Sequence, residues 1–338
     1  MNHEHLLPIG AAPIMSYEHH ASPLTVISQS NAYSTWLYSN FVQLECEIQY
    51  PVKGDVGFNF LHNKHIYFNC PHLDYLRMSS TYVKHFNRGI VPFLIESVQQ
   101  GYYPNVFLNH FYCPFEPSYQ KYHYWAAFLV YGFNETERIF HILGYADGHY
   151  SAKTISFSDV ELAFEYNDDS PVYKTMIKLF KYVPHVKDEL DLPYIRRSLE
   201  SYMASDGTIY PSRSAASCEP LVVGLECYNI VKQYLEKMLD RTKKVDVRPI
   251  HLLWEHKKLW VERLRYFQQQ GIEISETSTM EMESLEKRML TTRNLMIKLR
   301  ITNNYTILAK IVEGWDSVID EDVRCLSQVY EDLIKNEH

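Results

Sequence analysis

The sequence has little glycine, no paired cysteine motif and no run of basic residues. Only 12 of its 338 residues are glycine, and its six cysteines are scattered without CxxC spacing. In a chain of this length, such spacing argues against both a disulfide scaffold and a structural zinc site. The net charge is −8 and Lys and Arg form no consecutive run, so nucleic acid is not expected as the main partner.

Long apolar runs and targeting signals are also absent. No stretch approaches the ~18 uninterrupted apolar residues of a membrane-spanning helix, so no membrane partner is expected. The N-terminal segment has no basic region followed by a long apolar one. Together with the scattered cysteines, this favours a reduced, cytoplasmic setting.

Motifs for common cofactors are missing as well. GxGxxG, GxxxxGK and GxSxG do not occur, so neither a nucleotide cofactor nor α/β-hydrolase chemistry is expected. His251 and Glu255 are four residues apart and could share a helix face, but no third metal ligand accompanies them. No metal and no cofactor are therefore predicted.

Tyrosine, by contrast, is abundant, with 27 residues, and the apolar pattern changes along the chain. The first half contains short runs typical of β-strands, separated by turn signals. They predict an antiparallel sheet with strands at 105–112, 127–133 and 138–145. The last two flank the polar turn "NETE" and form a hairpin.

The second half has the 3–4 residue periodicity of amphipathic helices. This pattern is assigned from about Pro171, beginning with "PVYKTMIKLFKYV", and continues to the C-terminus. The predicted fold class is α+β, with an α+β domain over 1–170 and a mostly helical domain over 171–338. The charged outer faces of the last helices permit a homodimer.

A helix start is predicted at "HHASPL", residues 19–24. Ser22 precedes Pro23, which is a typical arrangement of a hydroxyl cap and a proline in the first turn. Ser22 is either this cap or a nucleophile activated by a neighbouring base such as His20. Both interpretations stay open, and no cysteine lies beside the two histidines.

Three further polar residues flank the predicted hairpin. His123 precedes its first strand, His141 lies within its second strand, and Asp147 follows in an Asp-Gly turn. A histidine can serve as a general acid or base, and a carboxylate can orient it. Each residue also has a structural explanation, because turns favour Asp-Gly and strands tolerate surface histidines.

Five segments together resemble the N-terminal domain family of butirosin biosynthesis protein H, which are papain-like proteins of antibiotic and nonribosomal-peptide pathways. The resemblance covers residues 15–170 best, and the segments are "HHASPLTVIS", "WLYSNFVQLEC", "QQGYYPNVFLNHFYCP", the stretch from "YHYWAAFLVYGF" to "SDVELAF", and "VDVRPIHLLWEHKKLW". It implies a papain-like N-terminal domain and acyl transfer from a carrier-protein thioester to an amine through a Cys-His-Asp set.

Carried over residue by residue, that set is not kept. The cysteine position falls near Ala21 or Ser22, the histidine position near Ala126, and the acidic position near Gly144. The resemblance therefore leaves two readings: a branch with different chemistry, or a fold retained for binding. In either case the site is expected between the helix at Pro23 and the strand at Ala126.

The predicted function is that of an accessory or amide-forming, acyl-transfer protein of secondary-metabolite biosynthesis. It would act on a carrier-bound or peptide-like intermediate, with an acyl or peptidyl carrier protein as partner. If it is an enzyme, it is an acyltransferase or thioesterase-like enzyme without a cysteine nucleophile. The alternative is a pseudoenzyme that binds a ligand or a carrier protein. The candidate catalytic residues are His20, Ser22, His123 and Asp147, and the candidate ligand-binding residues are His19, Tyr124 and Tyr131.

Overall fold

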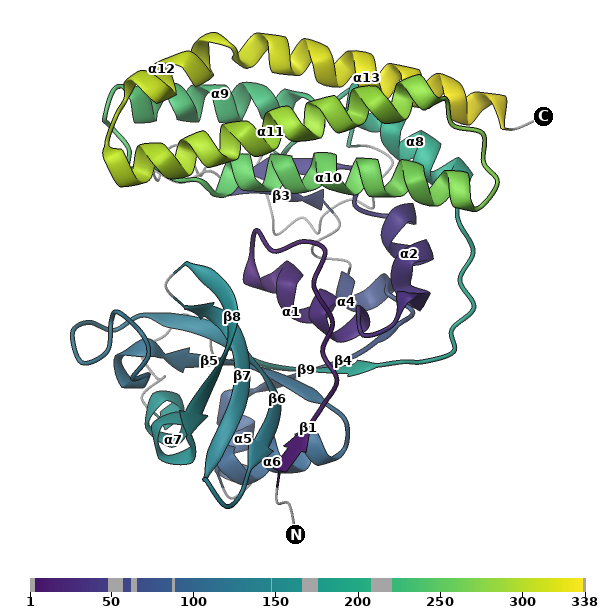
Figure 1. The fold of residues 1–338 in the computed structure, drawn as a ribbon. Helices are drawn as coiled ribbons and strands as arrows, with labels where there is room; N and C mark the ends of the chain where they lie inside the picture. The colour runs from purple at the N-terminus through teal and green to yellow at the C-terminus, as the bar shows by residue number, and fades with distance from the viewer. Residues whose placement is uncertain are drawn as a thin grey trace. The chain divides into compact units, whose positions relative to one another are not determined.

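A computed structural model shows an α+β protein, with antiparallel sheets in the N-terminal half and helices in the C-terminal half, as predicted (Figure 1). The chain forms two compact units, each described below by itself. The N-terminal unit contains Met1–Tyr33 and His65–Lys187, and the helical unit contains Ser34–Lys64 and Asp188–His338. The structure describes residues 4–47, 57–61, 66–86, 89–146, 148–165, 176–207 and 221–336.

The N-terminal unit is built on one antiparallel sheet. Its strand order is β4-β9-β5-β6-β7-β8, and β1 pairs with β6. The predicted strands and the hairpin are confirmed, although the first strand ends at Asn109 and a short 3-10 helix, His110–Tyr112, follows it. The strands are β1 (Glu4–Leu6), β4 (Leu73–Ser79), β5 (Tyr103–Asn109), β6 (Trp125–Asn134), β7 (Ile139–Ala146), β8 (His149–Ser156) and β9 (Met176–Tyr182).

The two faces of this sheet differ in chemistry. On one face, apolar side chains such as Val106 and Phe128 form a buried core with helices α6 (Ile90–Gln99) and α7 (Phe157–Glu165). On the other face lie α1 (Glu18–Ile27) and the short helix α4 (Ile66–Asn69) (Figure 1). Helix α5 (Ser80–Phe86) follows β4, and its Val83 belongs to the buried core. Because side chains alternate along a strand, odd-numbered residues of β5 face α1.

The prediction of a helix from about Pro171 is wrong for residues 176–182, which form strand β9. This strand lies between β4 and β5, so backbone partners are available on both sides. Ile177 and Leu179 enter the apolar core, whereas Lys178 points to the opposite face, which is a period of two. The C-terminal part of the helical unit therefore begins at Asp188 and not near residue 171. The unit also contains residues 34–64.

Helix α1 starts at Glu18 rather than at Ser22, and Pro23 lies inside it. A proline has no backbone N–H, so the carbonyl of the residue four positions earlier loses its helical donor. That carbonyl belongs to His19, and the Tyr67 hydroxyl donates to it at 3.3 Å. A side chain from α4 thus replaces the missing helical hydrogen bond, which lets the helix run through Pro23.

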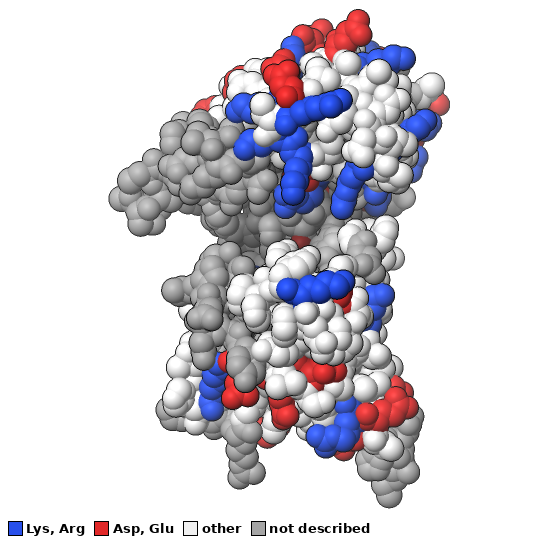
Figure 2. Space-filling model, turned by 90° about the vertical axis from the view of Figure 1, so that its left-hand side faces the viewer, with Lys and Arg blue, Asp and Glu red and all other residues white. Residues whose placement is uncertain are grey.

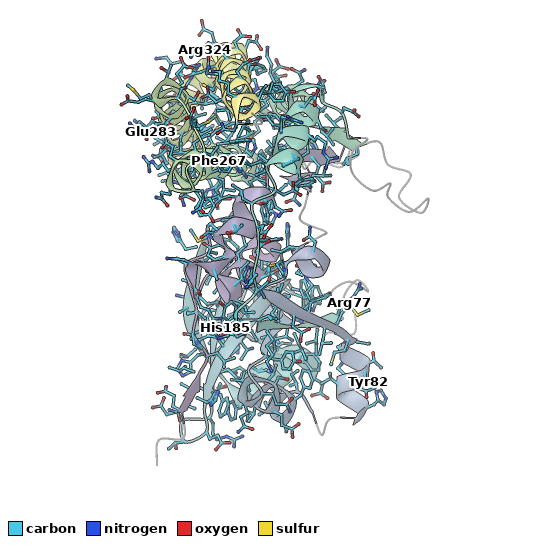
Figure 3. All side chains as sticks on the ribbon, turned by 90° about the vertical axis from the view of Figure 1, so that its right-hand side faces the viewer. Arg77, Tyr82, His185, Phe267, Glu283 and Arg324 are labelled. Carbon is cyan, nitrogen blue, oxygen red and sulfur yellow. The ribbon has the colours of Figure 1, made fainter. Side chains whose placement is uncertain are left out.

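The helical unit combines a small sheet with long antiparallel helices (Figure 1). Residues 34–39 form a helix and residues 44–47 form a strand, and the sheet has the order β10-β2-β3. Phe267 is fully buried among the helices, while Glu283 and Arg324 project from their outer surfaces (Figure 3). The elements are α2 (Ser34–Ser39), β2 (Leu44–Glu47), β3 (Gly57–Phe60), α8 (Leu192–Met203), β10 (Leu221–Val223), α9 (Glu226–Leu239), α10 (Arg248–Gln269), α11 (Glu276–Thr302), α12 (Thr306–Glu313) and α13 (Trp315–Lys335).

A buried ion pair lies inside the helical unit. The Lys257 ammonium donates to both carboxylate oxygens of Asp322, at 2.6 and 2.7 Å, and both side chains are fully buried. The hydroxyl of Tyr202 donates to the same carboxylate at 3.0 Å. Burial lowers the pKa of Lys257, and the adjacent Asp322 carboxylate opposes this shift. The pair ties α10 to α13 through two fully buried charges.

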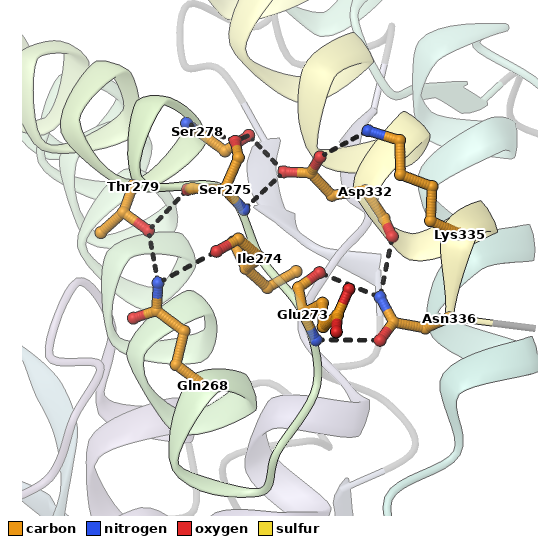
Figure 4. Close-up of polar contacts among 9 residues, drawn as sticks. All are labelled: Gln268, Glu273, Ile274, Ser275, Ser278, Thr279, Asp332, Lys335 and Asn336. Atoms are coloured by element: carbon orange, nitrogen blue, oxygen red, sulfur yellow. Dashed lines mark hydrogen bonds and ion pairs between the residues drawn. The ribbon is translucent and has the colours of Figure 1, made fainter.

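The start of α11 is held by a carboxylate from α13 (Figure 4). Asp332 accepts hydrogen bonds from the backbone N–H of Ser275 at 3.0 Å and from the hydroxyl of Ser278 at 2.6 Å. Burial acts to raise the pKa of Asp332, but these hydrogen bonds lower it below its ordinary value. Negative charge at a helix N-terminus also interacts favourably with the helix dipole.

Candidate functional site

A polar cluster lies between α1 and the sheet of the N-terminal unit. The Ser22 hydroxyl donates to Glu18 Oε1 at 2.7 Å and lies 3.2 Å from the Tyr150 hydroxyl. The Asn105 amide donates to Glu18 Oε1 at 2.5 Å and to Ser22 Oγ at 3.3 Å. The i, i+4 spacing on α1 brings Glu18 and Ser22 to one helix face, and the face points to β5 and β8.

The Glu18 carboxylate is held through only one of its oxygens. Both donors contact Oε1, and within the described part of the chain Oε2 has no hydrogen-bond partner. Glu18 is half-buried, so this oxygen is not sealed from solvent. The Oδ1 atom of Asn105, which is 1% exposed, also lacks a partner among the described residues. The cluster therefore presents two hydrogen-bond acceptors, which are Oε2 of the Glu18 carboxylate and Oδ1 of Asn105.

Two further groups extend the cluster along the sheet. Lys178 lies opposite Asn105 in the pairing of β9 with β5, so their side chains share a face. Its ammonium donates to the Tyr67 hydroxyl at 3.2 Å and lies 4.9 Å from that ring. Burial raises the pKa of Tyr67 well above its ordinary value, and the nearby Glu18 carboxylate adds to the shift. Burial likewise raises the pKa of Tyr150. Both phenols are therefore neutral donors at physiological pH.

The predicted histidines of α1 lie beside this cluster. His20 is fully buried, and burial, followed by the neighbouring His19, lowers its pKa well below the ordinary value. His19 is half-buried and stacks on Tyr17 with ring centroids 5.2 Å apart. Ser22 contacts Glu18, Asn105 and Tyr150, and neither histidine is among its hydrogen-bond partners.

His123 lies at the other end of β5. Its Nδ1 is 2.9 Å from the Asn109 amide nitrogen, and its ring stacks between Phe111 and Trp125 at centroid distances of 4.6 and 6.0 Å. Asn109 and Asn105 are four residues apart on one face of β5, which separates them by roughly 13 Å. The structure thus divides the predicted catalytic residues between two locations, with His123 away from Ser22.

The remaining candidates are spread over the N-terminal unit. Tyr124 is 54% exposed, and its ring lies against His110 at 5.3 Å. Tyr131 is half-buried further along β6, with its ring 5.9 Å from His141. Asp147 lies outside the described residues.

The positions that the resemblance assigned to a histidine and an acid face away from α1. Ala126 pairs with Leu108, and Gly144 lies on the same core face as Phe128. A Cβ atom on Gly144 would come within 2.2 Å of the Phe128 ring, so a carboxylate there would displace the core. Packing against Phe128 therefore explains Gly144, and Ala126 and Gly144 both lie on the sheet face away from α1.

The five cysteines that the structure describes are all buried, and none of these five is in a disulfide. Burial raises the pKa of Cys325 to about 12 and moves those of Cys113 and Cys227 above the ordinary value. A thiol must ionise and be accessible to act as a nucleophile. The other two are Cys46 and Cys70.

We expect native protein to resist alkylation at these five cysteines, because all five are buried and burial raises the pKa of Cys113, Cys227 and Cys325. Iodoacetamide at neutral pH followed by peptide mass mapping measures this. Protein unfolded in guanidinium is the control and should be modified at every thiol. Rapid, selective labelling of one of the five in native protein would identify a reactive thiolate and contradict the prediction.

The described residues contain neither a membrane-spanning helix nor a cluster of metal ligands. Across these residues, none of the helices has the length and apolar character needed to cross a bilayer. In the same part of the chain, no three His, Cys, Asp or Glu side chains are grouped so that they could hold a metal ion.

Sequence reasoning missed Glu18, Asn105, Tyr150, Tyr67 and Lys178. A signal existed for two of them. Glu18 is four residues before Ser22, and Asn105 is one of two asparagines in a strand that is otherwise apolar or aromatic. The contributions of Tyr150 and Tyr67 depend on strand order and on the packing of α4, which spacing in the sequence does not predict.

Comparison of the chain with models of known protein families finds no match. A search of curated proteins finds no match either.

Proposed function

We propose that the N-terminal unit binds an amine-bearing, carrier-bound or peptide-like intermediate of secondary metabolism without forming a covalent bond to it. The observation that carries this proposal is the Glu18 carboxylate, which is fixed through Oε1 and open at Oε2. A carboxylate held in this way is a natural partner for an ammonium group, because the charge-assisted hydrogen bond needs no rearrangement of the acceptor. The pathway rests on the family resemblance alone.

The groups around Glu18 favour an aminoacyl ligand over a simple cation. Asn105 Oδ1 offers a second acceptor for the ammonium hydrogens. Lys178 is a donor on the same sheet face as Asn105, suited to a carbonyl oxygen. In a ligand with an ammonium group and a nearby acyl carbonyl, the ammonium would donate to Glu18 and Asn105 and the carbonyl would accept from Lys178. Glu18 is an acceptor and Lys178 a donor, which suits a ligand with an ammonium group at one end and a carbonyl oxygen at the other.

Acyl transfer through Ser22 is the less supported alternative. Ser22 is fully buried, and its hydroxyl proton points to Glu18. Attack on a thioester carbonyl requires an accessible oxygen and a base that removes its proton during the reaction. Here the hydroxyl serves to orient the carboxylate. The role proposed for Ser22 is therefore positioning, and the role proposed for Glu18 is recognition.

Intact-mass analysis separates binding from acyl transfer. We expect the mass of the protein to stay unchanged after incubation with the glycyl thioester of N-acetylcysteamine. The thioester should also disappear no faster than in buffer, because no nucleophile is available. A glycyl adduct that maps to Ser22, and that is lost in Ser22→Ala, would replace the binding proposal with covalent catalysis.

A further inference from the structure

One end of the helical unit carries cations without matching carboxylates. Residues 287–312 contain six Lys or Arg and no Asp or Glu, although the whole chain has a net charge of −8. The loop between α9 and α10 adds Arg241, Lys243 and Lys244. We call the set Lys237, Arg241, Lys243, Lys244, Lys298 and Arg300 the basic end.

The fold brings these segments together. Helices α10 and α11 pack against each other and are joined by the short connection 270–275, so the end of α11 returns to the start of α10. The Arg293 guanidinium donates to His251 at 3.0 Å between these helices. The Arg241 guanidinium lies 4.7 Å from the Tyr305 ring, which joins the end of α9 to the start of α12. Figure 2 faces this end of the helices and shows Lys and Arg gathered on it.

The cations of the basic end differ from those elsewhere in the helical unit. Lys232, Arg265, Arg288 and Arg324 each form an ion pair, with Asp316, Glu283, Glu321 and Glu281 respectively. None of the six residues of the basic end has an ion-pair partner among the described residues.

Among the described residues, three acidic residues are near the members of the basic end in sequence, fewer than its six cations. They are Glu236, Asp240 and Asp246, and the Asp246 carboxylate is already held by Arg248 at 2.7 Å. Unpaired surface cations of one sign raise the local potential and attract an acidic partner.

An exposed apolar residue lies within the same surface. Ile301 follows Arg300 at the end of α11 and is 76% exposed, the largest exposure among the large apolar side chains described. Protein interfaces commonly combine an apolar anchor with a charged rim, whereas phosphate backbones need only the charge. A long polyanion would also meet the acidic remainder of the chain.

We infer that the basic end is a docking surface for a compact acidic protein, which presents carboxylates around an apolar contact for Ile301. The carboxylates pair with Lys243, Lys244 and Arg300, and the encounter is steered by charge. This inference concerns the helical unit alone and does not depend on amine binding at Glu18.

The test uses the full chain and an apo acyl carrier protein as the probe, because that protein is small, helical and acidic and carries no acyl group. The variant Lys243→Glu/Lys244→Glu/Arg300→Glu reverses three charges of the basic end, of which Lys244 and Arg300 are exposed and Lys243 is half-buried. The matched control Lys187→Glu/Arg197→Glu/Lys287→Glu makes the same charge change at exposed positions elsewhere. Fluorescence anisotropy at low and at physiological ionic strength measures binding.

We expect the parent and the control variant to bind the probe within two-fold of each other, and binding to weaken with salt. The basic-end variant should bind at least about ten-fold more weakly. Ile301→Ser should weaken binding at both ionic strengths. No measurable binding of the probe at low salt, or equal loss in both charge variants, would overturn the inference. Tighter binding of duplex DNA or of phosphatidylglycerol vesicles through the same residues would also overturn it.

Discussion

Replacing Asp322 by Ala is expected to lower the free energy of unfolding by about 3–5 kcal/mol. The substitution leaves the Lys257 ammonium fully buried without its counter-charge, and it removes the acceptor of the Tyr202 hydroxyl. Transfer of an unpaired charge out of water dominates the loss. Denaturant titration followed by circular dichroism measures the unfolding free energy, provided that the helical unit unfolds in a single transition.

Two comparisons identify the cause of that loss. Asp316→Ala removes a carboxylate whose side chain is 70% exposed in its pair with Lys232, and this should cost less than about 1 kcal/mol. The double variant Lys257→Met/Asp322→Leu removes both buried charges and should be more stable than Asp322→Ala alone. If Asp322→Ala is no less stable than Asp316→Ala, the buried pair does not hold α10 to α13 as described.

Glu18→Gln should weaken binding of an aminoacyl thioester by roughly 10- to 100-fold, the range expected for loss of a charge-assisted hydrogen bond. Gln keeps an oxygen that can accept from Ser22 and Asn105, so the local structure should remain. Calorimetric titration with the glycyl thioester of N-acetylcysteamine gives the affinity. Glu161→Gln, an exposed carboxylate on α7 of the same unit, is the matched control and should bind like the parent.

The sequence predicted the fold class well where local pattern and tertiary context agree. The hairpin of β6 and β7 has apolar strands on both sides of a polar turn, and its register follows from that turn. Strand β9 was missed because "MIKLFKY" fits either period over so few residues, and its two neighbours in the sheet decide the outcome.

The candidate site was only partly predictable. The segment containing Ser22 was identified, but Pro23 was predicted to start the helix. The Tyr67 hydroxyl that replaces the missing donor to the His19 carbonyl comes from α4, which is distant in the sequence. Strand β8 was not predicted, so Tyr150 could not be placed beside Ser22. A short distance between side chains on α1, β5 and β8 is a property of the tertiary fold, and no single spacing in the chain encodes it.

A thermodynamic cycle between Glu18 and the ligand amine tests recognition at Glu18 most directly. The four calorimetric titrations combine the parent and Glu18→Gln with the glycyl thioester and with the acetyl thioester, which lacks the amine. If Oε2 binds the ammonium, Glu18→Gln weakens binding of the glycyl compound and leaves the acetyl compound unchanged, so the two changes are strongly non-additive. If Glu18→Gln affects both ligands equally, or neither, Glu18 does not recognise an amine and the proposed function is contradicted.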